Sequence, residues 1–593
     1  MDIGHSTSAS PFLNQTMDSD ISEQLHPSKR LKPSAPSPDL ISRDATQSTD
    51  SKRKLSVSTH DVVEDLGDPS LMGDQDPFEF DENMTEYYLH HYFTKINYTT
   101  YCMFPKTAFM KWVRTCREKS SWDKMLVYAM MAHGTIFATN ARKHVDGEIF
   151  SRIAHRAIGE SSGEFKLQVV QTRLILALYD FSRGSTAKAW DFTGSAVRSA
   201  CGMKLNIEEG VIDIKDDETL VYGLDKPTLI ECRRRTFWSA YIMDRFNGFC
   251  SGHLAMFHNE DCLLRLPCNE KMYEAGHIPL TPFFDNRIID SQQFVYGDSN
   301  DPGMMAYLVQ IASIWGEVLA RAYRSRYQQP EAWGVPFEEF YQQTTKRLEA
   351  WERSLGAHLR CSPGNIDKAG QSGHLGTYGA LHTLYHSTMM KLNRHARYDR
   401  MQRQHVDRNV KCAYDHACKT LDMMKAITRQ NKSGRGGNFG FAVSSPFTGF
   451  AILTAVDIIT ATGSMADLMS ENSRSIELLA GGIEVMTELS EHWSSAKTQL
   501  KLIADRFDNL MATTQSSHGL PERTRVTSFF AKDPLETTLG LEHDLVYALP
   551  KKRYLEALGW GSLIREGDEM LEVLKRGSSV NIEPLCKTSI LDN

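Results

Sequence analysis

The strongest constraint on the fold is the spacing of apolar residues, which follows a helical period from Thr85 to about residue 513. Leu89, Tyr92, Phe93 and Ile96 recur at the spacing that places residues on one face of a helix. Alternating strand patterns are few and short, and no period of 20 to 50 residues repeats along the chain. We therefore expect an all-α protein. The expected helices cover residues 125–137, 169–179, 185–205, 228–249, 303–325, 337–355, 376–395, 408–429, 447–463 and 475–513.

The first 83 residues differ in composition from the rest of the chain. They are rich in Ser, Thr and Pro and poor in apolar residues, so they cannot bury enough surface to offset the entropy of ordering. Length alone would allow up to four domains, but the continuous helical pattern favours one. The expected organisation is a disordered Ser/Thr/Pro-rich arm over 1–60, an acidic linker over 61–83, one large multi-helix domain over 84–513 and an irregular tail with a short helix over 514–593.

The arm carries short basic clusters that are candidates for nuclear import. Exposed, extended Lys and Arg suit the acidic groove of an import receptor, and the simpler alternative is the solvated charge of a linker. Ser56 follows the second cluster in a pattern typical of a basophilic kinase site, where a phosphate would add negative charge beside the cluster. We therefore expect a nuclear location. The two clusters are Lys29, Arg30 and Lys32, and Lys52, Arg53 and Lys54.

Two acidic segments are candidates for transcriptional activation, with a mere solubilising role as the alternative. Residues 61–83 hold nine acidic residues and no basic one. The second candidate is Asp568–Leu574, near the C-terminus. Acidic residues alternate with hydrophobic ones in such segments. In the first segment the interleaved residues are Leu66, Leu71, Met72, Phe78 and Phe80.

Composition excludes several classes of protein. A net charge of −7 is no overall electrostatic footprint for nucleic acid, and 11 cysteines in 593 residues are too sparse for a disulfide scaffold. The chain does not start with a secretory signal pattern. The longest apolar run, over 447–462, is short for a membrane span and carries Asp457. We expect a soluble intracellular protein with reduced thiols and no membrane partner.

Enzyme and metal motifs are lacking in the sequence. There is no His-Glu-x-x-His, no Gly-x-Ser-x-Gly and no Walker lysine. The spacing Cys250, His253, His258 and Cys262 resembles a zinc knuckle superficially, but the ligand order is unusual, and buried thiols with loop histidines are the simpler interpretation. The sequence thus predicts no catalytic residue, no metal site, no cofactor in this chain, and no enzyme.

The segment 228–249 carries three consecutive arginines, Arg233 to Arg235, which suggest a phosphate site at first sight. Helical geometry favours a structural role instead. Arg234 and Arg245 project onto the apolar face, where we expect them to be semi-buried, stacked on aromatic rings and paired with carboxylates. Arg235 lies one turn from Glu231, an i, i+4 pair. The aromatic partners expected for this stacking are Trp238 and Tyr241, and the face also includes Phe237 and Ile242.

The segment 185–205 is the second informative helix. Trp190, Gly194, Val197 and Cys201 fall on one stripe of it. The small residues Gly194 and Ala200 predict close approach of another helix.

These residues resemble the middle homology region of fungal zinc-cluster (Zn2Cys6-type) transcription regulators. Its core is matched by Arg233-Arg234-Arg235-x-Phe237-Trp238, Asp244-Arg245, Gly252, Asn259-Glu260-Asp261 and Leu266-Pro267. The resemblance covers most of residues 85–510. One departure is Lys204-Leu205-Asn206, where the family often has Gly-Leu-His, a change that would alter a helix cap. Further matches are Tyr92-Phe93, Asn97, Phe104-Pro105, Phe109, Leu167–Gln171, Leu176–Tyr179, Arg183-Gly184, Ala189-Trp190, Gly194–Ala200 with Arg198, Leu392–Arg394 and Ser445–Phe447.

The resemblance implies a nuclear regulator of RNA polymerase II transcription, acting on a pathway-specific gene set through a helical sensing domain. It implies a homodimer or transcription co-factors as partners, and a small-molecule inducer. Family members usually carry a six-cysteine cluster that holds two zinc ions and reads DNA. Here no cysteine precedes Cys102, so we expect zinc and promoter DNA only where a cluster lies outside this sequence or a partner supplies one. The alternatives are a co-regulator without its own DNA reader and an all-α small-molecule-binding protein outside transcription.

Overall fold

A computed structural model describes residues 75–97, 99–161, 163–215, 221–251, 255–285, 288, 302–327, 336–394, 403–432, 445–462 and 472–504. The chain divides into two compact units, Met1–Asp65 and Leu66–Asn593, and all described residues belong to the second. The import clusters, Ser56 and the tail beyond residue 513 lie outside the described residues, as do Gly252 and the acidic residues before 75.

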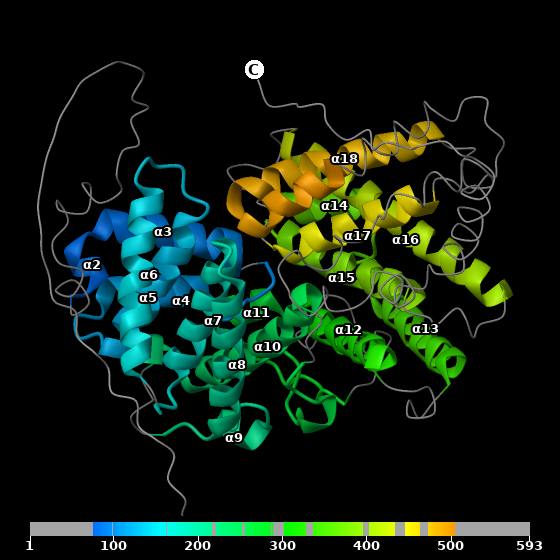
Figure 1. Ribbon diagram of the computed structural model, residues 1–593. Coiled ribbons are helices and arrows are strands. Elements are labelled where there is room, and N and C mark those ends of the chain that lie inside the picture. The colour runs from blue at the N-terminus through cyan, green and yellow to red at the C-terminus, as the bar shows by residue number, and fades with distance from the viewer. Residues whose placement is uncertain are drawn as a thin grey trace, which may run out of the picture. The chain divides into compact units, whose positions relative to one another are not determined.

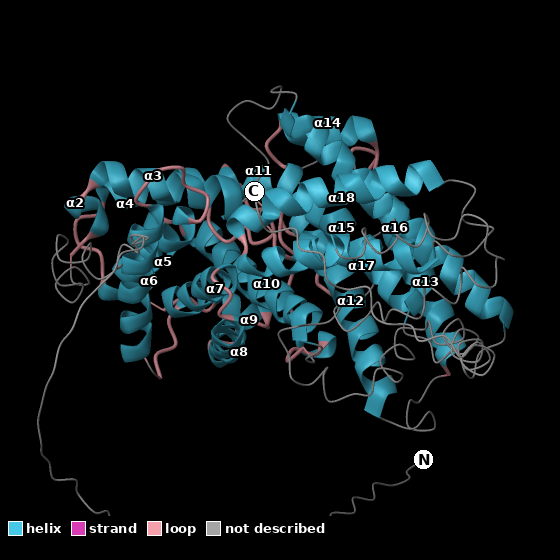
Figure 2. Ribbon diagram, turned by 45° about the horizontal axis from the view of Figure 1, so that its top comes forward, coloured by secondary structure: helices cyan, strands magenta, loops and turns pink. Residues whose placement is uncertain are grey.

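Regular structure in the described residues is helical, and the prediction of an all-α fold is confirmed (Figures 1 and 2). The only β-pairs described are isolated bridges between Ile207 and Leu263, Arg265 and Phe283, and Cys268 and Pro302. The helices are α2 (Pro77–Phe80), α3 (Glu82–Tyr92), a π-helical turn (Phe93–Asn97), α4 (Lys106–Thr115), α5 (Ser121–Thr135), α6 (Lys143–Glu160), α7 (Leu167–Ser182), α8 (Thr186–Gly202), α9 (Glu208–Ile212), a 3-10 turn (Val221–Gly223), α10 (Lys226–Ser251), a 3-10 turn (Asn259–Asp261), α11 (Glu270–Glu274), α12 (Met304–Tyr327), α13 (Phe337–Ser354), α14 (Pro363–Gln371), α15 (Leu375–Arg394), α16 (Arg403–Lys432), α17 (Phe447–Thr462) and α18 (Asn472–His492).

Helix α5 is the central helix of the N-terminal part, where it contacts α3, α6 and α7 (Figure 1). Every residue from Met125 to Thr135 is buried, which is typical of a helix covered on all sides. Its start is fixed by a capping box, in which the Ser120 hydroxyl accepts from the Asp123 N–H and the Asp123 carboxylate accepts from the Ser120 N–H. Near its end, Gly134 lets the backbone of α3 approach closely.

Helix α10 links this part to the C-terminal helices, since it contacts α7, α8, α12 and α17. Helix α17 in turn contacts α15, α16 and α18, which explains why its sequence is mostly apolar (Figure 2). Its one acidic residue, Asp457, is buried. Within the described residues, no helix has the combination of length and hydropathy that a membrane span requires.

The end of the acidic segment is folded, so the expected disorder is wrong for residues 75–83. Asp76 caps α2 and forms an ion pair with Lys119 at 2.6 Å, and both side chains are almost inaccessible (4% and 1%). Phe78 is buried in the core beside them. Burial of Phe78 and the capping of α2 by Asp76 offset the ordering cost that composition alone suggests. Phe78 is therefore unavailable to an activation segment, whereas Phe80 is half-exposed.

Helix α8 buries a different face from the predicted stripe. Trp190 is half-exposed and Cys201 is exposed. A Cβ added to Gly194 would meet only the Met256 side chain, at 3.7 Å, which is an ordinary contact. The face turned toward α7 and α10 is made instead of small residues, and the larger aromatic ring stays at the surface. This buried face includes Ala189, Thr193, Ala196, Val197 and Ala200.

The departure at Lys204 does alter a helix cap. Lys204 has a φ of 55°, the left-handed conformation that a helix end usually gives to glycine. A side chain in this conformation costs roughly 1 kcal/mol.

Because α3 and α5 approach so closely at Gly134, adding a single methyl group there should destabilise the fold. In Gly134→Ala, the new Cβ would lie 2.1 Å from the Tyr88 carbonyl oxygen, and backbone cannot move aside as a side chain can. We expect a loss of about 3 kcal/mol in the free energy of unfolding, measured by urea denaturation. The control is Gly159→Ala on α6, where nothing lies within 4 Å. This control should gain about 0.5 kcal/mol; equal stabilities of the two variants would contradict the described contact.

Candidate functional site

The three consecutive arginines of α10 all lie inside the protein. Arg233, Arg234 and Arg235 are 3%, 5% and 0% exposed. Arg233 donates to the carbonyl oxygens of Gly210 and Asp213, at 2.9 and 3.3 Å. A buried guanidinium needs partners for its donors, and backbone carbonyls serve this purpose here.

Glu231 is the carboxylate that Arg234 and Arg235 share. We call the buried arginines of α10, which are Arg233, Arg234, Arg235 and Arg245, together with their partners the arginine network. Arg234 contacts the Oε2 atom of Glu231 at 2.5 Å, and Arg235 contacts its Oε1 at 2.9 Å, so the predicted i, i+4 pair is present. The Cys268 N–H donates to the same Oε1. Burial raises the pKa of Glu231, but Arg234, Arg235 and this N–H together hold it below its usual value. Arg234 also binds Glu208 at 2.5 Å, which ties α9 to α10.

Arg235 connects segments that are far apart in the sequence. It donates to the carbonyl oxygens of Cys268 (2.5 Å) and Cys102 (3.3 Å). Its guanidinium lies 4.4 Å from the centre of the Tyr273 ring, and the Tyr273 hydroxyl donates to Met103. Arg235 therefore holds α10, the chain before α4 and the chain around α11 together.

Arg245 performs the same task at the other end of α10. It pairs with Asp244 at 3.1 Å and donates to the Phe257 carbonyl oxygen at 2.8 Å. Asp244 accepts from the N–H groups of Met256 and Phe257. Arg245 lies 4.2 Å from the Tyr241 ring centre, which is the stacking that the helical spacing predicts.

The other predicted stacking, of Arg234 on Trp238, is wrong. The carboxylate pairing expected for Arg234 is present, because its guanidinium binds Glu208 and Glu231. The Trp238 ring packs edge-on against Phe237, Tyr241 and Phe284, and its indole N–H donates to the Arg265 carbonyl. Arg198 is exposed on α8 and takes no part in the network.

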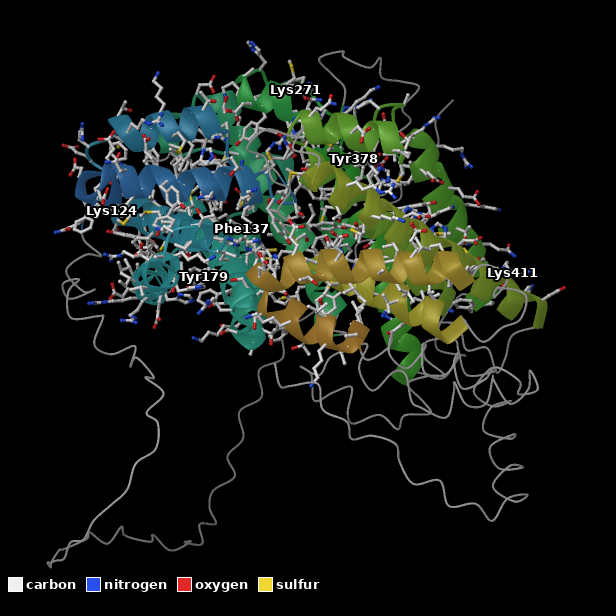
Figure 3. The ribbon with its side chains drawn as sticks, turned by 90° about the horizontal axis from the view of Figure 1, so that it is seen from above. Lys124, Phe137, Tyr179, Lys271, Tyr378 and Lys411 are labelled. Atoms are coloured by element: carbon white, nitrogen blue, oxygen red, sulfur yellow. The ribbon has the colours of Figure 1, made fainter. Side chains whose placement is uncertain are left out.

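A cavity of about 400 Å³ adjoins this network. Figure 3 labels two of its residues, Lys271 and Tyr378, and places Lys411 apart from them. Its walls come from α11, the start of α12, the chain after α13, α14 and the start of α15. The lining residues are Asn269, Glu270, Lys271, Met272, Pro302, Met304, His358, Leu359, Asn365, Lys368, Ala369, Ser372, His374 and Tyr378.

The acidic residue of the cavity is already engaged. The Glu270 carboxylate accepts from the N–H groups of Met304 and Met305, at 3.1 and 3.0 Å, in the first turn of α12. A helix N-terminus is the favoured place for a negative charge. Glu270 lies two residues after Cys268 in the sequence. Arg235 therefore holds this short segment at Cys268, and the start of α12 holds it at Glu270. Sequence reasoning missed this cavity, because no local pattern marks it.

The possible metal ligands of this region lie apart from one another or serve other contacts in the described residues. Among the described residues, no three His, Cys, Asp or Glu side chains converge as metal ligands would. The Cys262 thiol donates to the His258 carbonyl, and the side chains of Cys250 and His253 lie outside the described residues. His386 and His416 form a buried pair with their Nδ1 atoms 2.8 Å apart. Burial lowers the pKa of His416 to about 3, so its ring is neutral at pH 7.

The arginine network predicts large losses of stability on truncation. Arg234→Ala leaves Glu208 and Glu231 short of a partner, and Arg245→Ala does the same to Asp244. Breaking a buried pair costs about 3 kcal/mol or more. We expect both variants to melt well below the parent protein in thermal unfolding. The control is Arg198→Ala at the surface, which should change stability by less than about 0.5 kcal/mol; unchanged melting of both α10 variants would contradict the structural role.

Comparisons with known proteins identify the region that contains this network. The fungal specific transcription factor domain matches residues 89–353. Two uncharacterized transcriptional regulatory proteins of Schizosaccharomyces pombe are 26% and 28% identical over 46% and 52% of this chain, and 28% and 38% of their own lengths. A Zn(2)-C6 fungal-type transcription factor of Fusarium oxysporum is 22% identical over 61% of this chain and 39% of its own length. This chain thus matches only about a third of the length of these relatives. No solved structure matches. Residues 89–353 of this chain belong to the fungal specific transcription factor domain family.

Proposed function

We propose that this chain regulates RNA polymerase II transcription of a pathway-specific gene set in the nucleus. The observation that carries the proposal is the fungal specific transcription factor domain over residues 89–353. The names of the matched relatives, transcriptional regulatory proteins and a Zn(2)-C6 factor, support it. No enzymatic role follows from the site, because its central residues are buried ion pairs that hold backbone together.

Within this proposal the helical region is a regulatory domain that senses a small molecule and controls transcription accordingly. Its support is the cavity beside the arginine network, which a small-molecule inducer would occupy. The segment between α10 and α12 borders the cavity and is held by Arg235 and Glu270. The second subunit of a homodimer, or transcription co-factors, would then respond to the conformation of this helical region.

The alternative within transcription is a co-regulator that acts through DNA-bound partners. The observation that favours it is the lack of any cysteine before Cys102, and of the six-cysteine spacing, in these 593 residues. Zinc and promoter DNA belong to the proposal only where a cluster is present elsewhere or supplied by a partner. An all-α binding protein outside transcription is the remaining alternative.

The regulatory proposal predicts an effect on a reporter gene. We expect the full chain, fused to a neutral DNA-binding module, to change transcription from a reporter of moderate basal activity at least threefold relative to the module alone. Removing Asp568–Leu574, or residues 61–74 up to the start of the folded region, tests the two activation candidates separately. An expressed, nuclear fusion that leaves transcription unchanged would support a role outside transcription. Salt-sensitive promoter binding by the purified, unfused chain would instead contradict the co-regulator alternative.

The import clusters predict loss of nuclear accumulation on neutralisation. Replacing Lys29, Arg30, Lys32, Lys52, Arg53 and Lys54 by Ala should abolish accumulation of a fluorescent fusion, because the receptor groove needs these charges. Ser56→Asp should lower accumulation and Ser56→Ala should not. The control removes exposed lysines of the helical region, in Lys111→Ala, Lys346→Ala and Lys411→Ala together. Undiminished accumulation without the clusters would disprove their role.

A further inference from the structure

The cavity between α11, α12, α14 and α15 has an unbalanced charge. Lys271 of α11 and Lys368 of α14 line it and are exposed, and within the described residues neither has a carboxylate oxygen within 4.0 Å. Oppositely charged side chains that lie three or four residues apart on a helix can pair, so the acidic residues of α11 decide whether this charge is compensated.

Both acidic residues of α11 accept hydrogen bonds from helix N-termini. Glu270 accepts from the first turn of α12, as described above. Glu274 accepts from the N–H groups of Lys106 and Thr107, at 2.9 and 2.7 Å, in the first turn of α4. The partial positive charge of each helix start holds these carboxylates. Glu270 is the one carboxylate among the described lining residues, against Lys271 and Lys368, so the cavity keeps a net positive charge.

The remaining polar groups of the cavity are neutral. Burial lowers the pKa of His374, an effect that Glu270 opposes and Lys271 reinforces. Burial and Lys271 also lower the pKa of His358. Asn365 already donates both of its amide hydrogens, to the carbonyls of Ala357 and Arg360. Recognition of a charged group in this cavity therefore falls to the two lysines.

The rest of the lining is apolar and suits a small hydrocarbon body. The Tyr378 hydroxyl donates to the Arg360 carbonyl at 2.8 Å, so this residue offers its ring rather than a hydrogen bond. A volume of about 400 Å³ lies within the range of small-molecule sites. The apolar side chains of the lining are Met272, Met304, Leu359, Ala369 and Tyr378.

We propose that this cavity binds a small organic anion, with a carboxylate or phosphate group on Lys271 and Lys368 and a short apolar body against Met304, Leu359 and Tyr378. Lys271 adjoins Glu270, so a bound anion contacts the segment that Arg235 and the start of α12 hold in place. Such an anion is the inducer of this regulator. The role as inducer rests on the proposed function, whereas the binding itself does not.

Calorimetric titration of the purified full chain tests the site. The probes are 3-phenylpropanoate and phenyl phosphate, which distinguish the two anionic groups, with neutral 3-phenylpropanamide and inorganic phosphate as comparisons. We expect at least one of the aromatic anions to bind at least tenfold more tightly than the amide and than inorganic phosphate, because both the charge and the apolar body contribute.

Variants locate the binding in the cavity. Lys271→Gln with Lys368→Gln should weaken the anion at least tenfold, and these lysines are exposed, so the variant should melt like the parent protein. Ala369→Leu, which fills the apolar end, should also weaken binding. The matched control is Lys411→Gln, an exposed lysine outside the cavity (Figure 3), which should leave the affinity unchanged.

Several results would overturn the proposed site. They are binding of neither anion at 10 mM, equal binding of the neutral amide, or equal affinity in the double-lysine variant. If the anion binds as expected but leaves the reporter fusion unaffected, the site stands and the inducer role is rejected. An inactive reporter fusion together with intact anion binding counts against the proposed function alone.

Discussion

Buried guanidinium groups hold the short helix α9 and neighbouring irregular segments against α10. Arg233, Arg235 and Arg245 each donate to backbone carbonyls of chain outside the helix, at Gly210, Cys268 and Phe257. Burying such charges is costly unless each is paired and hydrogen-bonded. Glu231, Glu208 and Asp244 supply the negative charge. Arginine suits this role because its fixed fork of five donors reaches several acceptors at once, which lysine cannot do.

The network also determines where the cavity forms. Arg235 fixes Cys268 from the side of α10, and two residues later Glu270 caps α12. Glu274, at the end of the same short helix, caps α4. Helix α11 is therefore anchored to three longer helices through its flanks and carboxylates, and it forms one rigid wall of the cavity. Lys271 lies on this anchored element, so the backbone from which its side chain reaches the cavity is held in place.

Sequence periodicity predicted most of the long helices, including α7, α10, α12, α13, α15 and α17, because each buries a continuous apolar face. It missed α6, whose glycines and charged residues hide the pattern, and the short helices α4 and α14. The predicted pairing of Glu231 with Arg235 needed only helical geometry. By contrast, the pairs Asp76 with Lys119 and Glu208 with Arg234 join residues 43 and 26 positions apart. The fold alone brings such residues together, as it does Lys271 and Lys368, so no local pattern reveals them.

The use of backbone carbonyls as arginine acceptors has a consequence for sequence variation. A carbonyl oxygen is the same whatever side chain its residue carries, so the contacts at Cys268 and Phe257 depend on the path of the backbone and not on those side chains. Gly210 is restricted for a separate reason, because a Cβ there would lie 2.0 Å from the Lys204 carbonyl oxygen. An insertion or deletion beside Cys268 or Phe257 would shift the carbonyl out of reach. Related chains that keep this arrangement should therefore keep the lengths of the segments that carry Cys268 and Phe257, together with the arginines on α10.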